Sequence, residues 1–466
     1  MSDKIRIRLV PKTKGGESIT MDLREIRPFY AKRLAPDVNR ASEALKQSFS
    51  IGIESKLTRH NSLDAFIPRQ KIKELFKADL VEQIPSKTKA IAYKSAKKFI
   101  TTEKELKVPE NMKDTIAFAY IPTPPEFYGI SFIPPNVSLY QLRLLDVLRS
   151  LNGSLCHRNG WTGRNIRVAM ADTGFAKHPY FDSQGYNIQR TATPEISDPS
   201  IDDVGHGTGE SANVLILAPD CQFIGVKHDD YSALALETSL EQNPQILTNS
   251  WGWNIDKMSK SQLQNLNPNL FNELRDVENI INDALDDGII VLFAAGNGHL
   301  AFPASLPEVI SVGGVYVDKD GSLEASSYAS SFRSQLYPGR QVPDVCGIVG
   351  EFSYTEPMKG HIMLPVPNGS ELEGENMPST KKNKGWGIFS GTSAATPQIA
   401  GVVALMLCSN LNLTSVQVKS ILGETAKDVA KGKTALDDEA TIGPDLATGF
   451  GFVDAYEACL AANRMT

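Results

Sequence analysis

One serine of this chain is placed where its hydroxyl could attack a bound carbonyl group. Ser393 lies among small residues in the stretch Gly391-Thr392-Ser393-Ala394-Ala395-Thr396-Pro397, shortly before an apolar run from Ile399 to Cys408. The apolar run indicates a buried helix, and the first N–H groups of a helix have no partner within it. Ser393 therefore fits a nucleophile, although a serine before an apolar run is more often only a helix N-cap.

A serine hydroxyl becomes a nucleophile only when a base takes its proton and a third group orients that base. Among the seven histidines, His206 lies in the glycine-rich turn Gly205-His206-Gly207-Thr208-Gly209. Asp172 ends the apolar stretch 166–171 and precedes Thr173-Gly174, which is where strands of an open α/β sheet place functional groups. The chain order Asp, His, Ser differs from the orders in chymotrypsin and the α/β-hydrolases.

Five motifs in this order resemble those of the subtilisin-like serine proteases. The resemblance spans residues 160 to about 460, and these motifs carry it: Gly160-Trp161-Thr162-Gly163 through Asp172-Thr173-Gly174, Gly205-His206-Gly207-Thr208, Asn249-Ser250-Trp251-Gly252, Ala294-Ala295-Gly296-Asn297, and Ser390 to Pro397. The resemblance implies a serine endopeptidase in which Asp172 orients His206 and His206 activates Ser393.

The same resemblance assigns further site residues. Asn297 is implied as the side-chain donor to the oxyanion, with the backbone N–H of Ser393 as the second donor. A protein or peptide substrate is expected to lie extended along backbone edges. The residues implied for the walls and base of its main side-chain pocket are Ser250, Trp251, Gly252, Ala294, Ala295, Gly296 and Ala301.

The strand and helix pattern predicts an α/β fold with three layers and a mostly parallel sheet. Near-continuous apolar strands indicate burial on both faces of the sheet. Strands are predicted at 166–171, 222–227, 246–250, 289–294 and 309–315, and helices after His206, at 232–242, at 274–287 and after Ser393. We assign residues 151–466 to this catalytic domain.

The preceding residues predict a small α+β domain over 1–121, which resembles the propeptides of the family only loosely. Its predicted elements are strands at 4–10, 50–57 and 115–121, with helices at 36–49 and 69–84. Residues 122–150 are assigned to a Pro-rich linker and a helix at 139–151. The domain is expected either to restrain the protease by docking on it in cis or to serve as a permanent structural or recruiting domain.

The charge differs in sign between the two parts. Residues 1–150 contain 27 Lys and Arg against 17 Asp and Glu, and residues 151–466 contain 21 against 37. A basic segment can bind nucleic acid, but we find no zinc-finger, helix-turn-helix or stacking-aromatic signature. Docking between the two parts is the simpler interpretation.

Composition limits the class of protein to which this chain can belong. A chain of 466 residues, 41% hydrophobic and 22% charged, is typical of a two-domain globular protein, and it has no apolar signal-peptide core. No membrane association is expected, and the five scattered cysteines are expected to be reduced thiols of a cytoplasmic protein.

Departures from the family pattern bear on metals and partners. The helix after His206 reads Gly209-Glu210-Ser211 and reaches Pro219 without the insertion that carries calcium in many members. Neither a metal nor another cofactor is expected. The insertions 254–272 and 350–384 fit either recognition loops or surface decoration, and an accessory regulatory protein is a further expected type of partner.

Two other functions are considered. A protease-like regulatory or binding subunit with little activity is the alternative, and the complete set Asp172, His206, Asn297 and Ser393 favours the enzyme. A nucleotide-binding domain is excluded by the lack of a phosphate loop after the first strand.

Overall fold

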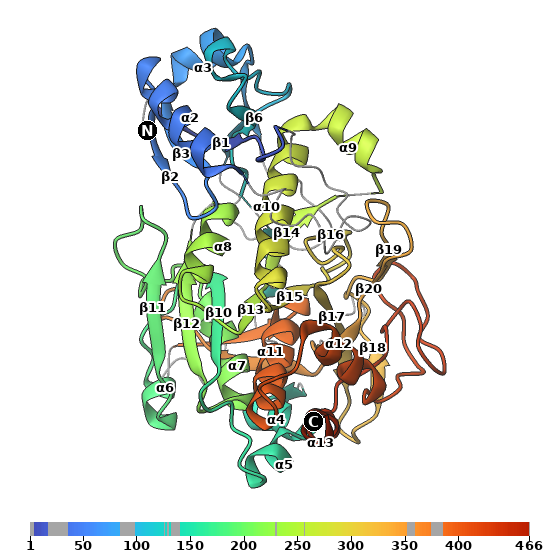
Figure 1. The fold of residues 1–466 in the computed structure, drawn as a ribbon. Helices are drawn as coiled ribbons and strands as arrows, with labels where there is room; N and C mark the ends of the chain where they lie inside the picture. Colours follow the sequence, from blue (N-terminus) through green and yellow to red (C-terminus); the bar gives the residue numbers. More distant parts are fainter. Residues whose placement is uncertain are drawn as a thin grey trace.

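The computed structural model describes residues 4–16, 36–83, 98–124, 126–127, 130–131, 140–228, 231–255, 257–351, 359–373 and 385–465. The N-terminal residues form a separate small unit above the larger α/β unit in Figure 1, and the C-terminus lies at the opposite end. This arrangement agrees with the two parts predicted from the sequence, although the domain boundaries themselves stay predictions.

An eight-stranded sheet forms the centre of the larger unit. All pairs along it are parallel except the last, between β17 and β18. The strand order is β11 (Ile188–Ala192), β12 (Gln222–Lys227), β10 (Arg167–Asp172), β13 (Ile246–Asn249), β15 (Ile290–Ala294), β17 (Ile310–Val317) and β18 (Leu323–Ala325), with β21 (Val345–Ile348) also paired to β17. The five predicted strands are confirmed within two residues at each end.

Helices cover both faces of this sheet, so the predicted three layers are confirmed (Figure 1). On one face α7 (His206–Leu217) and α11 (Thr392–Ser409) pack with the strands into one apolar core. On the other face α8 (Ser232–Leu240) and α10 (Pro268–Asp286) form a second core. Alternate strand residues face opposite helix layers, which explains why these strands are apolar throughout.

Helix α11 is long and apolar enough to cross a membrane by length and composition alone. Its apolar window is 89% buried inside the molecule, however. The helix is therefore accounted for as the core helix of a globular domain. Its burial fixes the position of Ser393, the second residue of the helix.

The remaining elements of the larger unit are short or lie at its periphery. They are β9 (Gln141–Leu142), α4 (Leu144–Ser150), α5 (Gly153–Arg158), α6 (Pro179–Gln184), β14 (Trp251–Asn254), α9 (Lys260–Leu266), β16 (Ala301–Phe302), β19 (Phe332–Arg333), β20 (Gln341–Val342), β22 (His361–Pro365), β23 (Trp386–Ser390), α12 (Ser415–Glu424) and α13 (Ala455–Arg464). The insertion 254–272 contains α9 and the start of α10, and 350–384 contains β22, beside the strand that leads to Ser393.

The N-terminal unit is an antiparallel sheet with helices on one face, which agrees with the predicted α+β class, although the strand predicted over 50–57 begins only at Glu54. Its strands are β2 (Glu54–Leu57), β3 (Leu63–Pro68), β1 (Lys4–Pro11) and β6 (Ile116–Tyr120), in that spatial order. Helices α2 (Val38–Ser50) and α3 (Arg69–Phe76) pack with one face of the sheet into a small apolar core. The short turn η1 (Glu110–Met112) precedes β6.

Two predicted helices are too long. The helix predicted over 69–84 ends at Phe76 because Lys77 adopts the left-handed conformation, with φ of 55°. The chain continues as β4 (Leu80–Gln83), which pairs with β5 (Phe99–Thr102). The helix predicted over 139–151 begins only at Leu144, after the strand β9, and residue 139 lies outside the described residues.

The open face of the N-terminal sheet meets α8 and α10 of the larger unit through a buried cation. The Arg8 side chain is fully buried; its guanidinium donates to Glu237 of α8 at 2.8 Å and to Asp276 of α10 at 2.9 Å. The Tyr120 hydroxyl donates to the same Asp276 at 2.7 Å. Burial alone would raise the pKa of Glu237, but the Arg8 charge outweighs it and the pKa is lowered. At Asp276, by contrast, burial outweighs the Arg8 charge and the pKa is raised.

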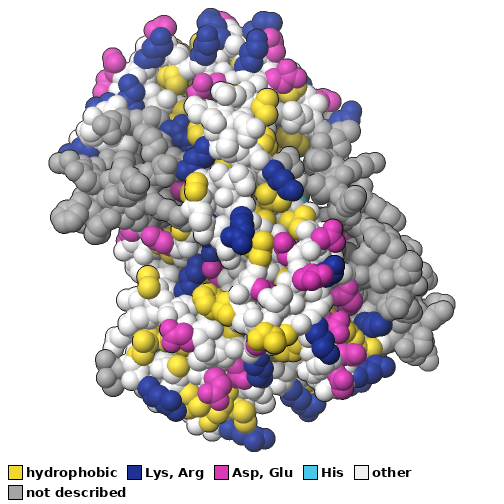
Figure 2. All heavy atoms as spheres, turned by 90° about the vertical axis from the view of Figure 1, so that its right-hand side faces the viewer, with side chains coloured by type: hydrophobic (Ala, Val, Ile, Leu, Met, Phe, Trp, Pro, Cys, Tyr) yellow, Lys and Arg dark blue, Asp and Glu magenta, His cyan; other side chains and the backbone are white. Residues whose placement is uncertain are grey.

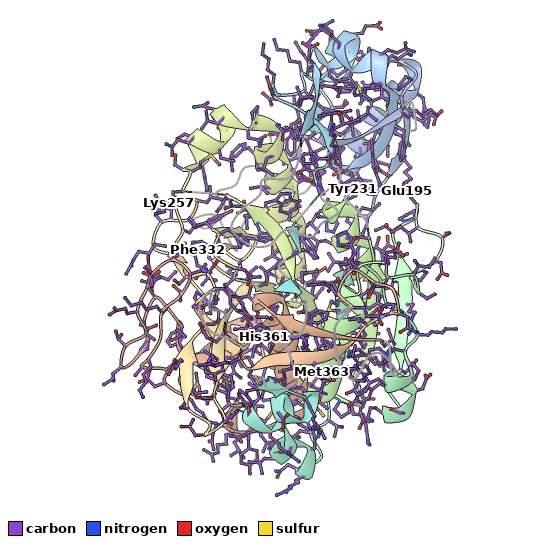
Figure 3. The ribbon with its side chains drawn as sticks, turned by 180° about the vertical axis from the view of Figure 1, so that it is seen from behind. Glu195, Tyr231, Lys257, Phe332, His361 and Met363 are labelled. Atoms are coloured by element: carbon purple, nitrogen blue, oxygen red, sulfur yellow. The ribbon has the colours of Figure 1, made fainter. Side chains whose placement is uncertain are left out.

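Further pairs around this contact join basic N-terminal side chains to acidic ones of the larger unit. Arg6 lies 2.5 Å from Glu195, and His60 Nδ1 lies 2.9 Å from Asp283. Figure 3 labels Glu195 and Tyr231 just below the N-terminal unit, and Arg6 lies over the Tyr231 ring at 4.0 Å. In Figure 2, Lys and Arg side chains mixed with acids cover the N-terminal unit at the top. The contacts match the opposite net charges of the two parts.

Replacing Arg8 by leucine is expected to reduce the free energy of unfolding by about 3–5 kcal/mol, since Glu237 and Asp276 would stay buried without their cation. Urea unfolding followed by fluorescence measures the loss. The control is Lys4→Leu, which removes an ion pair to Glu54 in which both side chains are exposed, and it should cost no more than about 1 kcal/mol. Equal small losses in both variants would contradict this account.

Candidate active site

The carboxyl end of the central strand β10 presents Asp172. The residue is fully buried, and its Oδ1 accepts a hydrogen bond from the Thr173 N–H at 2.7 Å. The next turn is tied to the start of α7 by Asp202, which accepts from the Thr173 hydroxyl at 2.7 Å and from the Thr208 N–H at 2.9 Å. Asp202 therefore fixes the end of β10 relative to the helix that carries His206.

His206 is the first residue of α7 and is fully buried. Its Nδ1 lies 2.8 Å from Asp172 Oδ1, so the predicted acid and base meet as expected. Burial alone would lower the pKa of His206, but the Asp172 carboxylate outweighs burial and the pKa is raised to about 9. The bond to Asp172 leaves Nε2 as the nitrogen that exchanges protons with other groups.

Ser393 lies in the first turn of α11, after Gly391. Gly391 has φ of 102°, which an L side chain rarely adopts, and its N–H donates to the Tyr328 hydroxyl at 2.9 Å. The Ser393 hydroxyl donates to the Ser250 carbonyl at 3.3 Å, and the Ser250 hydroxyl donates to the Ser393 carbonyl at 3.0 Å. The helix start and β14 are thereby held together at the candidate nucleophile.

Asn297 follows β15 and is fixed against the residue that precedes Ser393. Its Oδ1 accepts from the Thr392 N–H at 2.9 Å, and the Gly296 N–H donates to the Thr392 hydroxyl at 3.0 Å. Because these bonds fix the amide oxygen, the amide Nδ2 is the donor end of the side chain. The geometry suits an oxyanion donor beside Ser393.

The predicted substrate-binding residues lie on three neighbouring segments. Ser250, Trp251 and Gly252 belong to or precede β14, while Ala294 ends β15 and Ala295 and Gly296 follow it. Ala301 lies on β16, where it pairs with Asn254 of β14. All seven residues are buried. The structure brings these segments together, and their role in substrate binding stays a prediction.

Two short strands from the predicted linker pair with the edges beside Ser393. Strand β7 (Glu126–Phe127) pairs antiparallel with β14, with Phe127 opposite Trp251 and Glu126 opposite Gly252. Strand β8 (Ile130–Ser131) pairs antiparallel with β23, with Ile130 opposite Ser390 and Ser131 opposite Phe389. The chain itself therefore occupies both edges where an extended substrate is expected to bind.

Sequence reasoning missed the residues that support this site. Thr392 precedes Ser393 within the motif Ser390 to Pro397, and this position could have identified it as a supporting residue. Ser330 holds the Asn297 loop by accepting hydrogen bonds from the Gly298 and His299 N–H groups at 2.9 Å and 3.0 Å. Because Ser330 is distant from Asn297 in the sequence, no local pattern marks this role. Glu210 was noted only as a departure from the family pattern.

No group of three or more His, Cys, Asp or Glu side chains that could hold a metal occurs among the residues that the structure describes. The expected lack of a metal stays a prediction. The five cysteines are all free thiols, as predicted.

Gly207→Ala is expected to separate Asp172 from His206. A Cβ at position 207 would lie 2.4 Å from the Gly174 carbonyl oxygen and 2.9 Å from the Asp172 Cβ, which forces backbone to move. Because displacements near 1 Å can cost about 100-fold in rate, labelling of Ser393 by a fluorophosphonate should slow by about that factor. Gly15→Ala, whose Cβ would meet only Thr13 at 3.8 Å, serves as control. An unchanged labelling rate in Gly207→Ala would count against the tight packing described here.

Comparisons with known proteins agree with this geometry. The Subtilase family matches residues 163–451. Alkaline elastase YaB from Bacillus sp. (strain YaB) is 26% identical over 344 residues, 71% of this chain and 74% of that protein. Subtilisin E from Bacillus subtilis (strain 168) is 26% identical over 285 residues, 58% of this chain and 62% of that protein.

One solved structure, fervidolysin from Fervidobacterium pennivorans, a keratinolytic enzyme related to subtilisin, has a fold similar to this chain. The TM-score is 0.60 at 18% identity, over 98% of this chain and 61% of fervidolysin. At this identity the likeness shows the fold alone, and the chain spans about three fifths of the lengths of fervidolysin and subtilisin E. Since the family match covers more than half of the sequence, the chain belongs to the subtilase family of subtilisin-like serine endopeptidases.

Proposed function

We propose that this chain hydrolyses peptide bonds through an acyl-enzyme on Ser393. The observation that carries the proposal is the buried hydrogen bond of 2.8 Å between His206 Nδ1 and Asp172 Oδ1. A buried imidazole held by a carboxylate on Nδ1 has one nitrogen left to act as a base. Ser393 at the start of α11 and Asn297 beside it supply a nucleophile and an oxyanion donor.

Each of these groups has a defined role in the proposed reaction. The Ser393 hydroxyl leaves its bond to the Ser250 carbonyl and attacks the substrate carbonyl, while His206 Nε2 takes its proton. Asn297 Nδ2 and the Ser393 N–H donate to the oxyanion. His206 then protonates the leaving amine, and water, activated by the same imidazole, hydrolyses the ester and restores the serine.

The alternative function is a protease-like regulatory or binding subunit. Such a subunit has no chemical need to keep an acid, a base, a nucleophile and an oxyanion donor together. The presence of Asp172, His206, Ser393 and Asn297, with the contacts described above, therefore favours the enzyme.

We propose further that the N-terminal unit restrains the protease in cis. Two independent sets of contacts support this proposal: the buried Arg8 cluster on α8 and α10, and the pairing of β7 and β8 with the edges beside Ser393. A tether keeps the two parts at about millimolar effective concentration, so that even weak contacts stay closed. Substrates must displace the linker strands before they can bind.

The two strand registers indicate where the linker is cut. Phe127 lies opposite Trp251 and Ile130 lies opposite Ser390, so each register approaches Ser393 from one side. In the sequence, positions 128 and 129 connect these two strands. Both positions lie outside the described residues. We therefore propose that Ser393 cleaves the bond between Tyr128 and Gly129.

The proposal for the physiological setting starts from the cysteines. The five free thiols favour a reducing compartment. We propose an intracellular processing protease whose cytoplasmic substrates are limited by the N-terminal unit and by an accessory regulatory protein.

A fluorophosphonate probe should label wild type at Ser393 and fail to label Ser393→Ala. Loss of His206 or Asp172 should reduce peptide hydrolysis by several orders of magnitude, because the three groups act as a unit. Peptide mapping of the labelled protein and kcat measurements test this. Labelling at another residue, or labelling that persists in Ser393→Ala, would refute the assignment.

Incubated wild type should yield one fragment that ends at Tyr128 and one that begins at Gly129. Ser393→Ala, which keeps the fold but lacks the nucleophile, should stay a single chain. Intact mass measurement with N-terminal sequencing distinguishes the outcomes. Cleavage at another bond would overturn the register argument, and cleavage in Ser393→Ala would identify a contaminating protease.

The separated fragments also test the restraint. The N-terminal fragment, added back to the cleaved protease, should inhibit hydrolysis of an unstructured peptide, and inhibition should weaken at high salt because the contact pairs opposite charges. The Arg8→Leu fragment should inhibit less at every salt concentration. An unchanged rate with the wild-type fragment would rule out restraint by the N-terminal unit.

A further inference from the structure

A second carboxyl group lies beside the imidazole of His206. Glu210 follows His206 by one turn of α7, and the two side chains are fully buried. Glu210 Oε1 lies 3.8 Å from His206 Nε2, whereas Asp172 Oδ1 lies 2.8 Å from Nδ1. The imidazole therefore has one carboxyl group at each nitrogen.

The position of Glu210 is fixed by Asn213, one turn further along α7. Asn213 Nδ2 donates to Glu210 Oε2 at 2.8 Å, which directs the other oxygen, Oε1, toward the histidine. Among the described residues, Oε1 is buried and makes no hydrogen bond. At 3.8 Å, Oε1 is too far from Nε2 for a hydrogen bond, so an ionised Glu210 acts on His206 through its charge.

The other ionisable groups near the pair strengthen this effect. Besides Glu210, the groups that favour the protonated form of His206 are Asp172 from β10 and Asp202 from the loop before α7. Burial raises the pKa of Glu210 to about 7, although His206 and the bond from Asn213 act to lower it. Because the pKa of His206 is raised to about 9, Glu210 is ionised in the range in which the imidazole loses its proton.

A purely structural role does not account for this residue. A buried carboxyl group costs folding free energy unless it is paired, and an apolar side chain in the same place would cost nothing of this kind. The single hydrogen bond from Asn213 satisfies only one of its two oxygens. The other oxygen faces the nitrogen that must take a proton from Ser393.

We propose that Glu210 is a positioning residue that holds a positive charge on His206 from the side opposite Asp172, and thereby sets the pH at which His206 becomes a base. The inference rests on the role proposed above for His206. An ionised Glu210 keeps the imidazole protonated to higher pH, and it also stabilises the imidazolium that forms when Ser393 attacks.

The direct test is the titration of His206 in the full chain carrying Ser393→Ala, which needs no catalysis. With histidine labelled with ¹⁵N, NMR follows the ring nitrogens of His206 as the pH is changed. Adding Glu210→Gln, which keeps the shape but removes the charge, should lower the midpoint by about one pH unit or more. A midpoint that shifts by less than about 0.3 unit would overturn the proposal.

Two further variants separate charge from packing. Asn213→Ala removes the bond that favours ionised Glu210, so it should lower the His206 midpoint in the same direction by a smaller amount. Glu273→Gln removes another fully buried carboxyl group, on α10, and should leave the midpoint in place. A midpoint that falls equally in Glu273→Gln would show a general effect of buried charge and would refute the specific role.

The rate of fluorophosphonate labelling against pH gives the catalytic readout in the chain with Ser393 intact. Its acidic limb should move to lower pH in Glu210→Gln, and the plateau rate at high pH should fall severalfold. Merely structural damage would lower the melting temperature and the plateau without moving the limb, and would overturn the proposal. If wild type is not labelled at all, the proposed function fails, and the NMR titration still decides the role of Glu210.

Discussion

The close packing of α7 against α11 is the constraint on which the active site depends. The two helices lie side by side in Figure 1 and share one apolar core. They approach closely at Gly401, where a Cβ would lie 2.6 Å from the Leu217 Cβ and 2.9 Å from the Val214 carbonyl oxygen. One helix begins with His206 and the other carries Ser393 in its first turn, so the spacing of the two helices sets the spacing of base and nucleophile. The apolar core thereby fixes the relative positions of two polar groups.

Two buried sites in this molecule place a cation between two carboxyl groups, and they differ in one property. Arg8 keeps its charge at every pH that proteins meet, so in its pairs with Glu237 and Asp276 only the carboxyl groups can lose their charge. His206, between Asp172 and Glu210, loses its charge within the range in which enzymes work. The same arrangement therefore serves as a permanent contact in one place and as an adjustable base in the other.

The sequence predicts best where a function rests on neighbouring residues. Asp172, His206 and Ser393 each stand at one end of an apolar element within a short motif, so local pattern singled them out, and the family resemblance implied Asn297. The end of α3 at Phe76 could not be predicted from local pattern. The left-handed turn at Lys77 interrupts a sequence pattern that otherwise continues as a helix. The role of Arg8 depends on Glu237 and Asp276, which are more than 200 positions away, and no local signal marks such a pair. Glu210 lies close to His206 in the sequence, but its effect depends on burial, which only the fold reveals.

In the restraint that we propose, strand pairing serves both restraint and substrate recognition through one set of contacts. Strands β14 and β23 bind β7 and β8 through backbone groups, and backbone pairing tolerates many side chains. If an extended peptide substrate uses the same edges, as we propose, the linker competes with every such substrate. As long as the chain is continuous, the tether gives the linker the advantage of a high local concentration. A single cut in the linker removes that advantage on both sides of Ser393, since each short strand pair is then too weak to hold its segment. The remaining restraint would rest on the contact around Arg8, which does not involve the linker.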